Sequence, residues 1–234
     1  LAGAVIPAWS QSQTDRGVTM QCARECLEGF INDYLAALTA RDPQRLPLAP
    51  GAKFTENGAL LSPGDGLWKT AAGLTDYRIH AADPEAGQVA FIGTLTQLDG
   101  SPVMLALRLK VAGGAISEIE TLTAPPFRPT GSPLVAAPSP DFRLTVPPEQ
   151  RLTREEMIAL ANRNFDNILE ADGSHFADDC QRVENRMAMS TNPELEYPIA
   201  TLPGREKPHF GSMGCREQVE SHLFDTLDSV TPRR

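Results

Sequence analysis

Four side chains in this sequence are candidates for acid–base chemistry: Glu56, His80, Glu184 and His222. Glu56 ends a short expected strand and is followed by the hairpin signal Asn57-Gly58. A carboxyl group enclosed among apolar side chains has a raised pKa and can exchange a proton with a carbon acid near neutral pH. The alternative is structural: the carboxylate accepts backbone hydrogen bonds and fixes the turn.

The role of His80 depends on which way its strand faces. In the expected strand 76–82, alternation places Arg78 and His80 on one face and Tyr77 and Ile79 on the other. An inward-facing polar pair would form an acid–base site, whereas an outward-facing pair would be an ordinary hydrated surface. Both readings remain open at this level.

Three further residues are candidates for substrate binding: Tyr34, Trp68 and Arg108. Tyr34 could donate a hydrogen bond to a developing enolate, and Trp68 could shape an apolar pocket. Arg108 shares its strand face with alternate polar residues, so pairing with Glu118 or Glu120 across the sheet is the competing expectation.

The second half contains a polar-rich set in which Glu184 and His222 form the first pair to test for a second pocket. The sequence has no GxSxG elbow, no GxGxxG and no GxxxxGK[ST] loop, which argues against these serine-hydrolase, dinucleotide and phosphate sites. We therefore expect no cofactor.

The cysteines Cys22, Cys26, Cys180 and Cys215 form no CxxC pair. Cys22 and Cys26 lie four apart on one face of an expected helix, and neither His80 nor His175 has a spacing that would complete a zinc site. We expect no bound metal. Cys180 and Cys215 could form a disulfide in an exported protein, or they could be free buried thiols.

Composition restricts the partners. The net charge of −9 and the pI near 5.0 leave no basic stripe for a nucleic acid. No apolar run reaches the roughly 18 residues of a membrane span. The apolar start, residues 1–17, is either an N-terminal arm or the remnant of a signal peptide, and the second reading predicts a secreted or periplasmic protein.

The pattern of elements indicates an α+β fold. Apolar residues at three-and-four spacing predict a long helix over 19–40. Short strands follow at 53–56 and 59–61, then a short helix within 64–74. Residues 88–123 read as three long antiparallel strands joined by turns at Asp99-Gly100 and Gly113-Gly114.

This order and the segments FTENG, GDGLW, GQVAFIG, LRLKV and GGAISEIETL resemble the nuclear transport factor two-like superfamily, over residues 18–124. The superfamily includes ketosteroid isomerase and SnoaL-like polyketide cyclases. The resemblance implies a cone-shaped antiparallel sheet packed on the long N-terminal helix, with an apolar pocket between them. It also implies homodimers that pair back to back.

Beyond a proline-rich linker, residues 125–150, a capping box at Thr153 and Glu156 starts a second amphipathic helix. Arg154-Glu155 matches Arg24-Glu25, and residues 183–185 match 55–57, so we expect a second, related and mainly helical domain over 151–234. It has no counterpart of 88–123. The sequence is missing C-terminal residues, the rest is a separate chain, or these helices pack on the first domain; we favour missing sequence.

Two functions fit these features. The first is a cofactor-independent enzyme of the lyase, isomerase or cyclase type that moves protons on a small hydrophobic or aromatic molecule. The second is a non-catalytic ligand-binding or dimerising module with structural carboxylates. A glutamate enclosed in a pocket beside a second titratable group would favour the enzyme.

Overall fold

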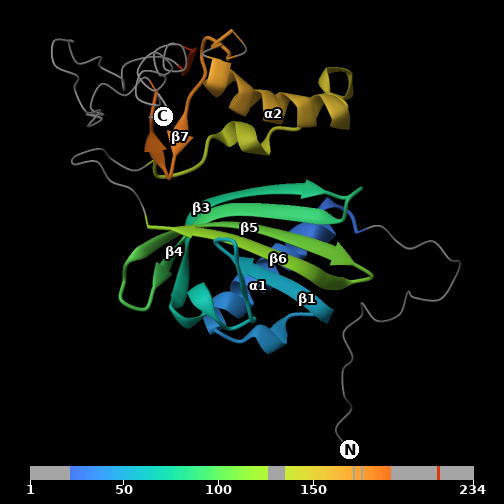
Figure 1. Cartoon of the computed structure of the whole chain (residues 1–234), viewed down its shortest axis with the longest axis vertical. Helices are drawn as coiled ribbons and strands as arrows, with labels where there is room; N and C mark the ends of the chain where they lie inside the picture. Colours follow the sequence, from blue (N-terminus) through green and yellow to red (C-terminus); the bar gives the residue numbers. More distant parts are fainter. Residues whose placement is uncertain (1–21, 126–134, 171, 175, 191–214, 217–234) are drawn as a thin grey trace, which may run out of the picture.

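A computed structural model describes most of the chain and shows a curved sheet with a helix on each side (Figure 1). The described residues are 22–125, 135–170, 172–174, 176–190 and 215–216. Helix α1 and the sheet come from the first half of the chain, and helix α2 with a small hairpin comes from the second. The expected α+β class, with a long N-terminal helix against a curved sheet, is confirmed.

Helix α1 spans Arg24–Ala40 and ends where Arg41 adopts a left-handed conformation, with φ of 56°. Its amide donates to Leu38, and the next residue begins the Asp42-Pro43 break. The expected end of the helix is therefore confirmed. Cys22, which we expected inside the helix, lies before its first residue.

Six strands form the main sheet in the order β2-β1-β6-β5-β4-β3. Their bounds are Leu48–Glu56 (β1), Ala59–Leu61 (β2), Ala71–Asp83 (β3), Gln88–Gln97 (β4), Pro102–Ala112 (β5) and Ala115–Ala124 (β6). The expectation of an antiparallel sheet is wrong at one place, because β1 pairs with β6 in parallel. That pairing joins strands far apart in the sequence, whereas sequence patterns show only neighbouring hairpins.

The meander over 88–123 forms as expected, with β4, β5 and β6 paired antiparallel in order. The glycines of its turns have positive φ, 80° at Gly100, 58° at Gly113 and 76° at Gly114, which other residues rarely adopt. The expected helix within 64–74 shortens to the 3-10 turn η3, Gly66–Lys69, because β3 already begins at Ala71.

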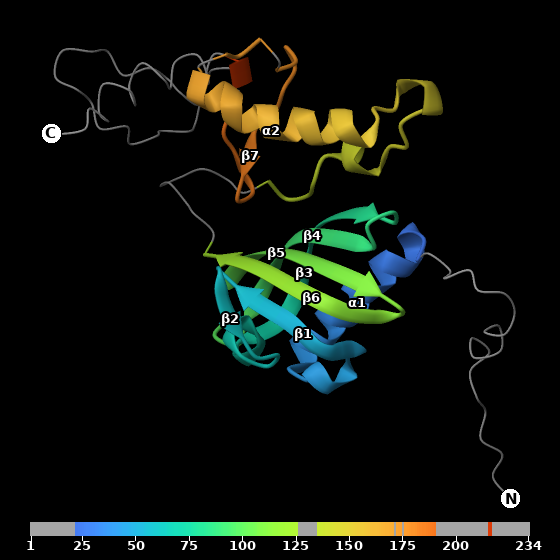
Figure 2. The ribbon, with the colours of Figure 1, turned by 45° about the vertical axis from the view of Figure 1, so that its right-hand side comes forward.

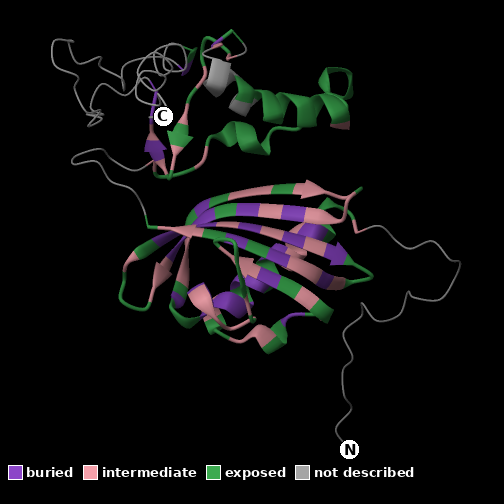
Figure 3. Ribbon diagram, viewed as in Figure 1, coloured by how far each residue is buried: buried purple, intermediate pink, exposed green. Residues whose placement is uncertain are grey.

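The core lies between α1 and one face of the sheet, here called the inner face (Figure 2). One side of α1 is buried, as the three-and-four spacing predicts: Leu27, Ile31, Tyr34, Leu35, Ala37 and Leu38. Alternate residues of the central strands meet it, including Val89, Phe91, Leu107, Leu109 and Ile119. Figure 3 shows buried residues alternating with others along these strands.

The second half contributes helix α2, Arg154–Glu170, and the two-stranded sheet of β7, Val183–Glu184, and β8, Met187–Ala188. The capping box is confirmed: the Glu156 amide donates to Thr153 Oγ1 at 3.2 Å, and the Thr153 amide donates to Glu156 Oε2 at 2.7 Å. Two 3-10 turns precede α2, at Pro140–Arg143 (η4) and Pro148–Gln150 (η5).

All four cysteines are paired, as Cys22–Cys26 and Cys180–Cys215. The reading of buried free thiols is therefore wrong, and the pairing expected for Cys180 and Cys215 is confirmed. The second disulfide attaches residue 215 beside the β7–β8 hairpin. Within the described residues, no helix is long and apolar enough to cross a membrane.

Candidate functional site

The outer face of the sheet, opposite α1, is divided along the strand direction into an apolar and a charged half. Strand register places residues from four strands in rows across this face. One row is apolar: Ile79, Ile92, Ala106 and Leu122. Two residues further along the strands, the corresponding row is Ala81, Ala90, Arg108 and Glu120, and the row after it is Asp83, Gln88, Lys110 and Glu118.

The second half of the chain lies over this outer face. The Val135 amide donates to the Arg186 carbonyl at 2.6 Å, and Arg186 Nε donates back to the Val135 carbonyl at 2.9 Å. The Arg186 guanidinium carbon sits 5.1 Å from the centre of the Tyr77 ring. Arg154 of α2 pairs with Asp83 at the end of β3, with 2.5 Å between Nη2 and Oδ2.

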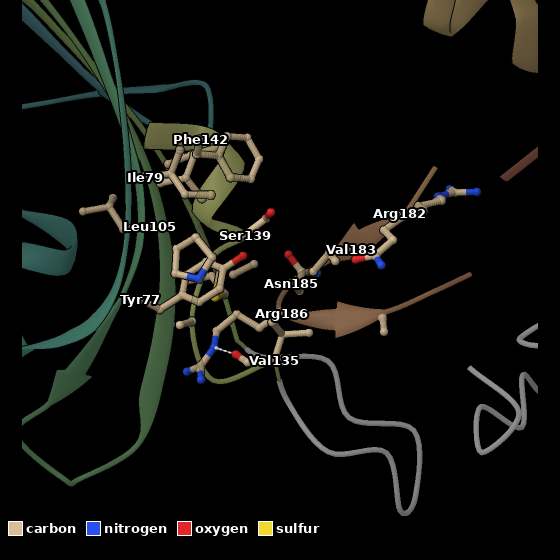
Figure 4. Close-up of a pocket in the computed structure, with 18 of the residues that line it drawn as sticks. Tyr77, Ile79, Leu105, Val135, Ser139, Phe142, Arg182, Val183, Asn185 and Arg186 are labelled. Atoms are coloured by element: carbon tan, nitrogen blue, oxygen red, sulfur yellow. Dashed lines mark hydrogen bonds between the residues drawn. The ribbon is translucent and has the colours of Figure 1, made fainter. Parts of the chain in front are cut away.

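A groove of about 930 Å³ remains between this cover and the sheet (Figure 4). Its floor includes Tyr77, Ile79, Ile92, Met104, Ala106 and Leu122, and its walls are formed by residues from within the segments 135–142 and 181–190. Several apolar side chains stay open to solvent here: Ile92 is 44% exposed, Leu122 57% and Phe142 64%. The volume is within the range of small-molecule sites.

Polar groups gather at the hairpin side of the groove. Tyr77 comes from β3, and Asn185 and Arg186 come from the β7–β8 turn (Figure 4). Burial raises the pKa of Tyr77, and the Arg186 charge opposes the shift. The tyrosine is therefore a neutral hydroxyl at physiological pH.

The expected site residues lie elsewhere. Arg108 is on the charged half of the outer face, where it pairs with Glu118 and Glu120 at 2.9 Å each. The expectation of this pairing is confirmed. Arg108 is not among the residues that line the groove.

Tyr34 and Trp68 meet on the inner face, where each side chain is 1% exposed. Their rings are 5.3 Å apart in an edge-to-face arrangement. Burial raises the pKa of Tyr34 far above its ordinary value; the Trp68 indole opposes this, and the nearby Glu56 charge adds to it. Trp68 Nε1 nevertheless makes no hydrogen bond of normal geometry to the described residues. Both rings are part of the core.

Glu56 is half-buried and accepts hydrogen bonds from a backbone amide. The Leu67 amide lies 3.1 Å from both carboxylate oxygens. Gly66, with φ of 63°, leaves room for the carboxylate, since a Cβ there would lie 2.2 Å from Glu56 Oε1. Glu56 thus stabilises the start of η3. The structural alternative is correct in that the carboxylate accepts a backbone hydrogen bond, but the donor is the Leu67 amide and not an amide of the Asn57-Gly58 turn.

His80 lies on the inner face. It is opposite Phe91, and their ring centres are 5.3 Å apart. Nε2 is buried and has no hydrogen-bond partner among the described residues. Burial lowers the pKa of His80, the Glu28 charge opposes this, and Arg78 adds to it. The ring is therefore neutral at pH 7.

The second pair of candidates is only partly described. Glu184 forms an ion pair with Arg182, and its side chain is 44% exposed. His222 lies outside the described residues. The structure brings Tyr34, Trp68 and Glu56 together on the inner face, and leaves His80, Arg108 and Glu184 apart from them and from each other.

The groove was not anticipated, although one signal for it is present in the sequence. Alternation puts Ile92, Met104, Ala106 and Leu122 on the face opposite the core, where polar residues are the rule for an exposed sheet. An apolar outer row indicates that something covers it.

Several solved structures align with part of this chain at low sequence identity. An NTF2-like protein of unknown function from Cytophaga hutchinsonii is 11% identical, with a TM-score of 0.34, and the match covers 46% of this chain and 95% of that one. A protein of unknown function with a cystatin-like fold from Methylobium petroleophilum is 17% identical, with a TM-score of 0.37, covering 47% and 83%. PrhC from Penicillium brasilianum is 11% identical, with a TM-score of 0.35, covering 43% and 82%. Such distant likenesses carry no argument about activity.

No curated protein matches the chain. One family model does, in two segments, residues 20–123 and 150–234, which together make up most of the sequence. The two segments contain α1 with the main sheet and α2 with the hairpin, respectively. The chain belongs to the family described as "Domain of unknown function (DUF8021)".

Proposed function

We propose that this chain is a binding protein for a small, largely apolar molecule, held in the groove between the outer face of the sheet and residues 135–142 and 181–190. The observation that carries the proposal is the exposed apolar floor inside a hollow of about 930 Å³. Transfer of apolar surface out of water supplies roughly 25 cal/mol per Å². A ligand that covers Ile92, Leu122 and Phe142 would gain this contribution.

The test uses the neutral apolar fluorophore N-phenyl-1-naphthylamine. We expect one molecule to bind per chain, with increased emission. Ile92→Glu puts a charge on the groove floor and should weaken binding by about tenfold or more, because the carboxylate would lose water when the ligand binds. Gln88→Glu is the matched control, since it adds the same charge on the same strand and face within the charged half. Equal affinities in the two variants would contradict the proposal.

A second candidate, a cofactor-independent lyase, isomerase or cyclase, is favoured by His80 in particular. A buried ring nitrogen without a partner and a lowered pKa are properties of a general base. The test is proton exchange on a panel of carbon acids followed by NMR. Under this proposal His80→Gln abolishes exchange, whereas Arg78→Gln does not; exchange that is equal in both variants would refute it.

We also propose that α2 and the β7–β8 hairpin descend from a second copy of α1 and the β1–β2 hairpin. Both helices have 17 residues and begin at an arginine, Arg24 or Arg154. Both hairpins turn at an asparagine with positive φ, 49° at Asn57 and 48° at Asn185.

An oxidising compartment, and so secretion or export to a periplasm, is proposed on the strength of the two disulfides. Structural disulfides persist outside the reducing cytosol. Mass spectrometry of the native protein after thiol alkylation tests this directly: four unmodified cysteines are expected, and labelling of any of them would count against it.

A further inference from the structure

Most polar groups of the groove already have partners within the chain. Ser139 Oγ interacts with Asp141, and Thr123 Oγ1 accepts from Asn57. Arg182 is paired with Glu184. These groups are satisfied in the structure, so they contribute little to ligand selection.

Arg186 differs from them. Its Nε donates a hydrogen bond to the Val135 carbonyl, and its guanidinium lies over the Tyr77 ring. Its Nη1 and Nη2 have no hydrogen-bond partner among the described residues. Two contacts hold the arginine in place, and the edge formed by Nη1 and Nη2 is left to bind a ligand. Arginine binds carboxylates through such an edge, with two parallel hydrogen bonds.

The charges of the lining point the same way. Among the described residues, the groove is lined by Arg182 and Arg186 and by no aspartate or glutamate, although the whole chain carries a net charge of −9. Tyr77 and Asn185 line the same groove as Arg186, whose guanidinium lies beside the Val135 carbonyl (Figure 4). Neither the Tyr77 hydroxyl nor the Asn185 amide makes a side-chain hydrogen bond among the described residues, so both can donate one to a ligand.

We propose that the groove binds an apolar molecule ending in a carboxylate, with the carboxylate on Arg186 and the apolar body along Ile79, Ile92 and Leu122. This inference rests on the proposed binding function and specifies its ligand. One guanidinium fork matches one carboxylate, whereas a phosphate dianion would call for further cations.

The test compares decanoate with decanol, which have the same chain length and differ in the head group, by calorimetry at pH 7.5. We expect the wild type to bind decanoate about tenfold more tightly than decanol, because a charged hydrogen bond at a partly exposed site contributes an affinity gain of about this size. Arg186→Gln should remove the preference, so that decanoate and decanol bind the variant with equal affinities. Arg78→Gln is the control, since it removes the same charge from the residue next to Tyr77, outside the groove lining.

N-phenyl-1-naphthylamine separates the two proposals. If neither this probe nor decanol binds the wild type, the binding function itself fails. If the probe binds but decanoate and decanol have equal affinities, only the carboxylate inference is overturned. Should Arg186→Gln disturb the cover and lose the probe, Arg186→Lys decides: it keeps the charge but has no fork, so it should bind the probe with a reduced preference for decanoate. A lysine variant that binds the probe and prefers decanoate as strongly as the wild type would overturn the inference.

Discussion

Each half of the chain contains a long helix and a short hairpin: α1 with β1–β2 in the first half, and α2 with β7–β8 in the second. The two pairs have similar local structure but differ in how they pack. Each helix has 17 residues, and each hairpin turns at an asparagine with positive φ. However, α1 buries Leu27 completely against a six-stranded sheet, whereas the corresponding Met157 of α2 is 53% exposed. Local sequence is thus sufficient for a helix and a turn, and the stability of each region depends on what packs against it.

The largest expected effect comes from truncating these two corresponding side chains. Leu27→Ala should lower the free energy of unfolding by about 2 to 5 kcal/mol, because it leaves a cavity in the core. Met157→Ala should change it by less than about 0.5 kcal/mol, as for an exposed position. Urea unfolding followed by circular dichroism measures both. Similar losses in the two variants would mean that α2 is packed as tightly as α1.

The disulfides give the next contrast. Cys180–Cys215 spans 35 residues and Cys22–Cys26 spans 4. Loop-closure entropy then gives about 4 kcal/mol for the first and about 2 kcal/mol for the second. Replacing each pair by serines and measuring guanidinium unfolding tests this order. A larger loss for the Cys22/Cys26 variant would contradict it.

The turn asparagines differ in their side-chain contacts. Asn57 Nδ2 donates to Thr123 Oγ1 at 3.0 Å, and its Oδ1 accepts from the Thr123 amide at 2.8 Å, joining the turn to β6. Asn57→Gly keeps the positive φ and removes these bonds, so it should cost about 1 kcal/mol. Asn185→Gly should be nearly neutral in thermal unfolding. An equal loss in both would show that Asn185 has a comparable structural role.

The smallest effect concerns the two corresponding arginines. Arg24 pairs with Glu28 on its own helix at 3.4 Å, whereas Arg154 reaches across to Asp83. The hydrogen bond from Arg154 lowers the pKa of Asp83. A lowered carboxyl pKa stabilises the folded state above the unfolded value near 4, and this contribution is lost as pH falls through the folded value. Carboxyl NMR titration should show the pKa of Asp83 rising in Arg154→Gln and unchanged in Arg24→Gln.

The parts of the fold that depend on nearby residues were predictable from the sequence. The end of α1, the turns of the meander and the capping box of α2 all follow from local patterns such as Gly113-Gly114 and Thr153 with Glu156. The parallel pairing of β1 with β6 was not predictable, because four other strands, β2 to β5, lie between them in the sequence.

The candidate site could be predicted only in part. Strand alternation correctly puts Tyr77 and Ile79 on the face opposite His80. The family resemblance, however, predicts a pocket on the inner face. There, α1 and large side chains such as Trp68 fill the space. The groove instead depends on the contacts of Arg186 with Val135 and Tyr77. These residues come from three segments that are distant in the sequence, so no local pattern predicts their contacts.

The cover also bears on the solubility of the protein. Ile79, Ile92, Ala106 and Leu122 form an apolar row across four strands, and the chain's own second half lies over it. If the cover were detached, this row would be an exposed apolar patch, and it could associate with the same patch on another copy of the protein. The segment that shapes the groove therefore also shields the sheet from unwanted self-association.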